Sequence, residues 1–341
     1  MVVGLGALAD AVAWAVLPAS VASAGATVVA VRALRRPPLA RAVPAPGAAV
    51  LAVALAGTGF VLSRPDRSPP DDPPVRAGSL LVMSGITSSS GRGAIFDSDP
   101  RRLGFTCEQP YYFSYAGPGD GQPRGTAVCP ITTGAPYEPD DTQRPQAEQV
   151  AAFAEQTRDL PRPVHVTTHS HGVWVAWAAV ATGAAEVDAM ILVGPFPDRV
   201  TEWPPAGEDG AGRVFGDLLR AAAPVADLVD FNFDPEAPAA RELLADPGAS
   251  RAILGRPVPA EVRTVSVTSA TDLPLMPRGW RMDVDRNVCP LRVAHPYLPL
   301  APQYFAEVQA FLDDAQGQSC PPWRDWGAAA ARPFGLPAGY P

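Results

Sequence analysis

Three of the four histidines in this 341-residue chain lie within seven residues of one another and surround a single serine. The stretch VHVTTHSHGVWVAW, residues 164–177, contains His165, His169, Ser170 and His171. A serine hydroxyl becomes a nucleophile when an imidazole accepts its proton and a carboxylate orients that imidazole. The stretch therefore raises the hypothesis that Ser170 is a nucleophile whose base and acid come from elsewhere in the chain.

The local sequence predicts a sharp strand-to-helix turn at Ser170. The preceding residues RPVHVTTHS are rich in β-branched side chains and predict a strand, and HGVWVAWAAVATG predicts a helix that ends at Gly183. Such a turn lifts the serine out of the sheet and places it at the positive end of the helix dipole. The usual form of this turn is G-x-S-x-G. Here Gly172 is present, and Thr168 stands at the first glycine position.

The base and the acid are predicted from their order along the chain. His295 lies late, in RVAHPYLPLAP, just before a predicted closing helix, and Asp272 ends the apolar segment TVSVTSATD. Together with Ser170 they occur in the chain order serine, aspartate, histidine. This is the order expected when the serine lies on such a strand-to-helix turn. Asp198, in GPFPDRV, is a rival acid because it follows the preceding predicted strand. The loop character of TSATDLPLMP favours Asp272.

Two backbone N–H groups are candidates for stabilising an oxyanion. The residue after the nucleophile is the usual donor, which assigns His171, and the second donor is expected in the loop VMSGITSSS, at Ile86 just after Gly85. The imidazoles of His169 and His171 are expected to point away from the hydroxyl. A metal site built from these two and His165 is disfavoured, because a strand and a turn would scatter the three rings. No metal or cofactor is predicted.

Short apolar segments alternate with amphipathic ones along most of the chain, which predicts an α/β domain with a mostly parallel sheet. In such sheets, reactive groups gather on the loops beyond the carboxyl ends of the strands. Residues 107–139, rich in proline, glycine and tyrosine, predict an irregular excursion. Strands are predicted from residue 79 and within 162–170, 188–196 and 261–272, and helices within 144–160, 171–183 and 301–315.

The N-terminal part of the chain differs from the rest. Residues 11–31 and 46–63 carry no charge; the first run is long enough to span a bilayer, and the second is at the short end of that range. The loop between them, RALRRPPLAR, carries four arginines. Arginines in a short loop place that loop in the cytoplasm. A transmembrane hairpin is therefore predicted, with everything after it outside the cytoplasm.

An alternative for this region is a signal peptide that follows a misplaced start codon. Residues 32–41 would then be its basic segment and 48–62 its apolar core. Both interpretations export the same domain. The predicted organisation is a hairpin at 1–63, a proline-rich linker at 64–77, an α/β domain at 78–320 with an insert at 197–262, and a proline-rich tail at 321–341.

Composition indicates which kinds of binding partner and which cellular location are expected. A formal net charge of −8, with no concentrated basic segment, argues against a nucleic-acid partner. The four cysteines form an even set within the part expected outside the cytoplasm, where disulfides persist. Spacing suggests Cys107–Cys129 and Cys289–Cys320, although three connectivities are possible and four free thiols remain an alternative.

Taken together, SGITSSSG, THSHG, SATDLPLMP and AHPYLPLAPQYF resemble the motifs of the α/β-hydrolase superfamily, within its lipase and esterase branch, over about residues 78–315. The resemblance implies a mostly parallel eight-stranded sheet and a lid inserted between the sixth and seventh strands, here residues 197–262. It also implies a catalytic triad of Ser170, Asp272 and His295. Ser84 stands where many members have histidine before the oxyanion glycine.

The sequence therefore predicts a membrane-anchored, extracytoplasmic serine hydrolase that cleaves a small-molecule or lipid ester through an acyl-enzyme. One alternative is a hydrolase-fold binding or scaffold protein that has lost catalysis. Another is a peptidase or thioesterase with the same triad, because the sequence does not distinguish leaving groups. Covalent labelling of the serine would separate the enzyme from the scaffold, and a substrate panel would separate the enzymes.

Overall fold

The structure of the chain is a computed structural model that describes residues 73–197, 234, 237–242, 249–270, 272, 276, 279–318 and 320. Both predicted membrane segments, the tail and most of the linker lie outside these residues, so the hairpin and the signal peptide stay predictions. Within the described part of the chain, no helix combines the length and the hydropathy needed to cross a membrane.

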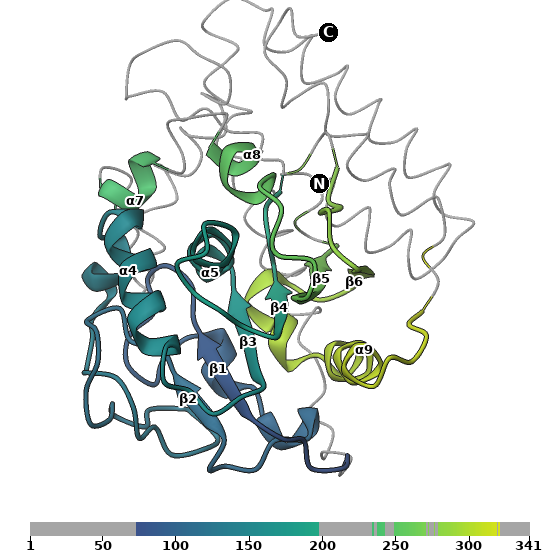
Figure 1. Ribbon diagram of the computed structural model, residues 1–341, viewed down its shortest axis with the longest axis horizontal. Helices are drawn as coiled ribbons and strands as arrows, with labels where there is room; N and C mark the ends of the chain where they lie inside the picture. The colour runs from purple at the N-terminus through teal and green to yellow at the C-terminus, as the bar shows by residue number, and fades with distance from the viewer. Residues whose placement is uncertain are drawn as a thin grey trace, which may run out of the picture. The chain divides into compact units, whose positions relative to one another are not determined.

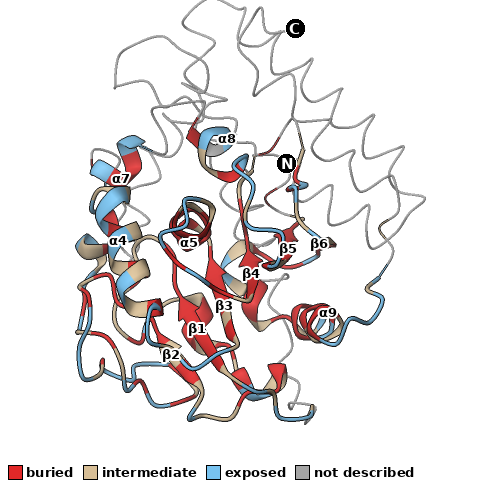
Figure 2. Cartoon of the chain, in the orientation of Figure 1, coloured by how far each residue is buried: buried red, intermediate tan, exposed pale blue. Residues whose placement is uncertain are grey.

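Six strands form one sheet, and every neighbouring pair of strands is parallel. Every residue of the first and fourth strands is buried, as expected for a parallel sheet that is covered on both faces (Figure 2). The order across the sheet is β2-β1-β3-β4-β5-β6. The bounds are β1 (Ser79–Met83), β2 (Pro110–Tyr112), β3 (Val164–His169), β4 (Ala189–Val193), β5 (Arg263–Ser269) and β6 (Arg286–Leu291).

Helices pack on both sides of this sheet, so the predicted α/β architecture is confirmed. Figure 1 shows α4 (Gln146–Thr157), α5 (His171–Ala181) and α8 (Ala249–Leu254) on one side and α9 (Pro302–Leu312) on the other. Nine of the eleven residues of α5 are buried, as in a helix at the centre of a core. The remaining described helices are short: α7 (Pro238–Ala240), η3 (Ala94–Asp97), η4 (Pro100–Leu103), η5 (Pro139–Gln143) and η9 (His295–Leu300).

The elements predicted from apolar patterns are all present, with ends that differ by up to three residues. The helix predicted within 144–160 begins at Gln146, directly after its N-cap residue Pro145. Two strands, β2 and β6, were not predicted. Both lie at the edges of the sheet and contain a proline, Pro110 or Pro290, which is tolerated only where no neighbouring strand needs the missing N–H.

The described residues contain six strands, and the eight that the family resemblance implies stay a prediction. The predicted insert at 197–262 lies between β4 and β5, and only parts of it, including α7 and α8, are described. One of those parts contacts the core, because the indole N–H of Trp177 donates to the carbonyl of Arg256 at 2.9 Å. The lid function of the insert stays a prediction.

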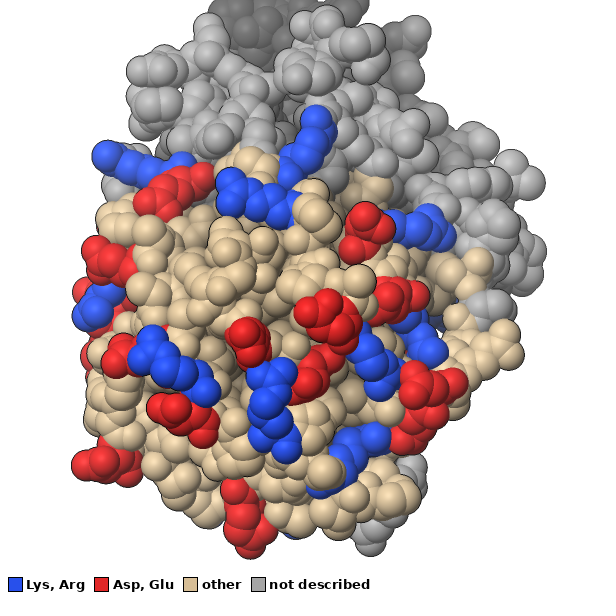
Figure 3. Space-filling view, viewed as in Figure 1, with Lys and Arg blue, Asp and Glu red and all other residues tan. Residues whose placement is uncertain are grey.

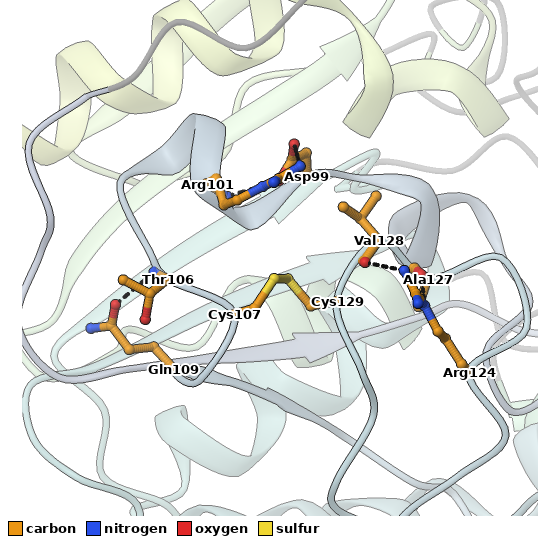
Figure 4. Close-up of a disulfide and its surroundings, with 9 residues drawn as sticks. All are labelled: Asp99, Arg101, Thr106, Cys107, Gln109, Arg124, Ala127, Val128 and Cys129. Carbon is orange, nitrogen blue, oxygen red and sulfur yellow. Dashed lines mark hydrogen bonds and ion pairs between the residues drawn. A yellow bond between two sulfur atoms is a disulfide. The ribbon is translucent and has the colours of Figure 1, made fainter.

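Two disulfides are present, in the pairing that the spacing suggested. The first joins Cys107 to Cys129 with Cα atoms 5.3 Å apart (Figure 4). Beside it, the Arg124 guanidinium donates to the carbonyls of Ala127 and Val128 at 2.9 and 2.6 Å. Covalent and polar bonds therefore order an excursion that has little regular secondary structure.

The second disulfide joins Cys289, within β6, to Cys320, beyond α9, with Cα atoms 4.9 Å apart. Cys320 packs against the fully buried side chains of Met276 and Trp280, as does the ring of Phe196. We call Met276, Trp280, Phe196 and Cys320 the apolar cluster. It connects the end of the domain to the loops that follow β4 and β5.

Candidate active site

The parallel sheet brings the predicted reactive residues to one edge, because the carboxyl ends of all its strands lie on the same side. Each group follows a different strand, and together they are separated by more than 200 positions along the chain. In chain order the groups are the loop 84–88 after β1, Ser170 after β3, Gly194 and Phe196 after β4, Asp272 after β5 and His295 after β6.

Ser170 occupies the predicted turn between β3 and α5 and has φ 56° and ψ −125°. A positive φ is unfavourable for a residue with a side chain and costs on the order of 1–3 kcal/mol. The Ser170 N–H donates to the carbonyl of Val193 at 2.8 Å, which ties the turn to the end of β4. His169 and His171 are buried, whereas Ser170 is partly exposed. The turn thus presents the hydroxyl side chain at the surface of an otherwise buried segment.

Two glycines allow the turn to approach the neighbouring loop. A Cβ on Gly172 would lie 2.7 Å from the carbonyl oxygen of Ser84, and a Cβ on Gly85 would lie 2.8 Å from the Cβ of Ser170. Thr168, in place of the first motif glycine, fits inside β3 with no exposed surface, and its hydroxyl has no partner among the described residues. The close backbone approaches that require a residue without a Cβ are therefore made at Gly85 and Gly172.

Asp272 and His295 form a direct pair. The Nδ1 of His295 lies 2.6 Å from Oδ2 of Asp272, and the side chains are 21% and 5% exposed. Because a carboxylate oxygen accepts, Nδ1 carries the proton of this bond, and in the neutral imidazole Nε2 is the nitrogen with a free lone pair. The rival acid Asp198 lies outside the described residues.

The imidazole of His295 is held on several sides. A Cβ on Gly194 would lie 2.5 Å from its Cε1, so the ring lies directly on the backbone after β4. The ring of Phe196 stacks on it with centroids 5.2 Å apart, and the ring of His169 lies at 4.8 Å. Phe196 is a member of the apolar cluster, so its ring connects this cluster to the imidazole of His295.

His169 has a contact that the sequence did not suggest. Its Nε2 lies 3.1 Å from the backbone carbonyl oxygen of His295, so Nε2 carries the proton and donates. Burial, together with the neighbouring His295, lowers the pKa of His169 to about 3, so the ring is neutral. His169 therefore fixes the backbone of the residue whose side chain is paired with Asp272. Its sequence position beside Ser170 gives no sign of this contact, which depends on a residue 126 positions later.

His171 and His165 have separate surroundings. The His171 ring stacks on Tyr115 at 6.4 Å, its nitrogens have no partner among the described residues, and burial lowers its pKa to about 4. The His165 ring packs against Phe105 at 5.2 Å. Within the part of the chain that the structure describes, no three histidine, cysteine or acidic side chains are grouped so that they could hold a metal ion.

The loop 84–88 contains Ile86, whose N–H the sequence predicts as an oxyanion donor. Thr87 has φ 63°, and its N–H donates to the hydroxyl of Thr142 at 2.9 Å. Three non-glycine residues have a positive φ among those described, and two of them are Thr87 and Ser170. The backbone N–H groups of Ile86 and His171 donate to no acceptor within the described residues. Strained backbone and unpaired donors thus occur together here, which is common where a chain binds or reacts.

One contact of a working triad is not formed. The Ser170 hydroxyl makes no hydrogen bond to His295 or to any other described residue. Such bonds are often loose until substrate is bound. Ser170 and His295 therefore lie at the same edge of the sheet without a direct bond between them.

Comparison with known proteins adds no assignment. The chain matches no model of a known protein family, and no curated protein matches it in sequence.

Proposed function

We propose that this protein is a serine hydrolase that cleaves an ester, of the α/β-hydrolase type that the motifs resemble. The observation that carries the proposal is the Asp272–His295 pair, with Nδ1 and Oδ2 2.6 Å apart, at the same edge of the sheet as the strained turn of Ser170. A hydrogen-bonded aspartate selects the imidazole tautomer that accepts a proton at Nε2. A serine at a strand-to-helix turn is the group that such a base activates.

The reaction would proceed in two halves. As Ser170 Oγ attacks the ester carbonyl, its proton moves to Nε2 of His295, and the resulting oxyanion accepts hydrogen bonds from the N–H groups of Ile86 and His171. The protonated imidazole then gives the proton to the leaving alkoxide, and an acyl-enzyme remains on Ser170. Water attacks this ester with His295 again as base, and the acid is released. The chemistry requires no metal or cofactor.

Other observations support the proposed substrate and location. On the face drawn in Figure 3, acidic and basic side chains are interspersed rather than gathered by sign, which suits a small-molecule or lipid substrate better than a nucleic acid. Phe196 stacks on His295 and gives the site an apolar side. Two disulfides support a location outside the cytoplasm. The uncharged N-terminal runs would anchor the domain to the membrane.

A fluorophosphonate probe and short p-nitrophenyl esters test the proposal. The full-length chain, purified in a mild detergent, should be labelled stoichiometrically at Ser170 and should hydrolyse the esters. Ser170→Ala should lose both properties. Equal ester hydrolysis by the two proteins, or labelling at another residue, would contradict the proposal.

The competing function is a binding or scaffold protein without catalysis. The missing hydrogen bond between Ser170 and His295 favours it. The same probe decides between the two functions, because a serine without an active base reacts slowly with fluorophosphonates. Thioester and peptide substrates in the same assay would identify the leaving group.

A further inference from the structure

A buried network of hydroxyl groups lies behind the loop that carries Ile86. The Oγ of Ser88 donates to the carbonyl of Gly85 at 2.7 Å, and the Ser88 N–H approaches the same oxygen at 3.4 Å. The phenol oxygen of Tyr137 lies 3.1 Å from Ser88 Oγ. Ser88 is 6% exposed and Tyr137 is 2% exposed, so water competes little for these bonds.

The direction of each bond follows from the number of protons available. A carbonyl oxygen can only accept, so the single hydroxyl proton of Ser88 goes to Gly85. Ser88 Oγ then accepts, and Tyr137 donates. Burial raises the pKa of the Tyr137 phenol, which keeps its proton at neutral pH. One relay therefore runs from Tyr137 through Ser88 to the carbonyl of Gly85.

The carbonyl of Gly85 and the N–H of Ile86 belong to one peptide group. In a planar trans peptide these two bonds point in opposite directions, so a hydroxyl that fixes the carbonyl also fixes the N–H. This peptide starts beside the nucleophile, because a Cβ on Gly85 would lie 3.5 Å from Ser170 Oγ. Hydrogen bonds accepted by the carbonyl also polarise the group and make its N–H a stronger donor.

We propose that Ser88 is a positioning residue for the oxyanion hole, and that Tyr137 acts through it. Ser88 holds the Gly85–Ile86 peptide so that its N–H faces the negative oxygen formed when Ser170 attacks the substrate. The inference rests on the proposed function, since it requires that attack.

A purely structural function of the same bond has a different signature. The contact from Ser88 to Gly85 spans three residues and stabilises a turn, which affects the free energy of unfolding. A bond that aims an oxyanion donor acts on the transition state and much less on bound substrate. It therefore changes kcat, and the affinity for tetrahedral analogues, while KM stays the same.

The experiment compares Ser88→Ala, Tyr137→Phe and the double variant in the full-length chain. Loss of an oxyanion donor costs about 10²–10³ in kcat, and loosening one should cost about tenfold in Ser88→Ala and less in Tyr137→Phe. KM for p-nitrophenyl esters should stay within about twofold, and inhibition by a trifluoromethyl ketone should weaken as much as kcat falls. The double variant should be no slower than Ser88→Ala, because Tyr137 acts only through Ser88.

Tyr115→Phe is the matched control. Tyr115 is also a buried phenol, and it donates to the carbonyl of Ser84 at 2.6 Å, one peptide before the group in question. Its loss should lower thermal stability about as much as Tyr137→Phe does, with kcat unchanged.

The outcomes separate this inference from the proposed function. Ser170-dependent hydrolysis with unchanged kcat in Ser88→Ala, or with equal losses in Tyr115→Phe and Tyr137→Phe, would overturn the positioning function of Ser88 alone. Absence of Ser170-dependent hydrolysis in the unaltered chain would overturn the proposed function, and the inference with it.

Discussion

The proposed nucleophile and the proposed base are held by two different kinds of structure. Residues 84–88 and 170–172, which we call the nucleophile side, follow β1 and β3, two inner strands of the sheet. They are fixed through the backbone, by positive φ angles and buried hydroxyl bonds. Gly194, Phe196, Asp272 and His295, which we call the base side, are fixed mainly through side chains, by one hydrogen-bonded pair and stacked rings.

The difference predicts which substitutions should lower the activity of each side. The nucleophile side should respond to changes that move the peptide chain, and the base side to the loss or displacement of a single side chain. It also explains why a local sequence motif predicts the proposed nucleophile, whereas the position of the proposed base depends on residues from several loops.

The largest expected effect is on the base side, at Asp272. Asp272→Asn should lower kcat by about 10⁴, because an amide no longer selects the tautomer that can accept the serine proton. Steady-state hydrolysis of p-nitrophenyl esters measures the loss, and circular dichroism checks the fold. Asp198→Asn is the comparison variant. A large loss in Asp198→Asn without one in Asp272→Asn would transfer the acid function to Asp198.

A smaller loss is expected from Gly194→Ala, which displaces the imidazole while every polar group is kept. The new Cβ would meet Cε1 of His295 at 2.5 Å, and misplacement by about an ångström can cost about 100-fold in kcat. Gly183→Ala is the matched control, because its φ of 73° is close to the 67° of Gly194 but no atom lies within 4 Å of the new methyl. Both variants should lose about 1 kcal/mol of stability, and only Gly194→Ala should lose activity. Equal activities would contradict the contact with His295.

The two disulfides should separate stability from activity. They span 22 and 31 residues, and each is worth about 3–4 kcal/mol in the chain-entropy picture. Replacing Cys289 and Cys320 by serine should lower kcat several-fold at temperatures where the domain is still folded, because Cys320 packs in the apolar cluster that contacts His295. Replacing Cys107 and Cys129 should lower the melting temperature with kcat unchanged. Ester hydrolysis and thermal unfolding, measured on the same samples, check both, and similar kcat losses in the two variants would contradict the distinction.

The smallest expected effect is on acid stability. Burial lowers the pKa of His171 to about 4 and that of His169 to about 3, from a usual value of 6.5. Below pH 6.5 the unfolded chain binds protons that the buried rings of the folded protein do not bind. The free energy of unfolding that the two neutral histidines contribute is therefore complete above pH 6.5, and it is lost as pH falls toward 4 for His171 and toward 3 for His169. Between pH 7.5 and pH 5, the titration of each histidine should lower the free energy of unfolding by about 2 kcal/mol.

His171→Phe keeps a ring against Tyr115 and removes one of these two titrations. Urea unfolding at pH 7.5 and pH 5 should therefore show a loss about 2 kcal/mol smaller in the variant than in the unaltered chain. Equal losses in the two proteins would show that His171 is not a source of acid sensitivity.

The sequence predicted those features that depend on neighbouring residues. β3, the turn at Ser170 and α5 were predicted because β-branched residues, a small turn and an apolar helix follow one another directly. Edge strands β2 and β6 were missed, because a proline in a short segment argues against a strand unless its edge position is known.

The contacts that complete the site were beyond sequence reasoning for another reason. Ser88 and Tyr137 are 49 residues apart, Thr87 and Thr142 are 55 apart, and His169 and the carbonyl of His295 are 126 apart. A hydroxyl or imidazole that binds a distant backbone group leaves no periodic pattern in the chain. Only the fold shows which of the many serines and threonines has such a partner.

The backbone conformation of Ser170 also bears on which residue this position would hold without catalysis. Glycine adopts φ 56° and ψ −125° without the strain that a side chain adds, so Ser170→Gly should raise the free energy of unfolding by about 1 kcal/mol or more. If the hydroxyl were no longer needed, a glycine arising at this position would be retained because it adds stability. On the proposed function, glycine at residue 170 would therefore mark relatives of this chain that have lost catalysis.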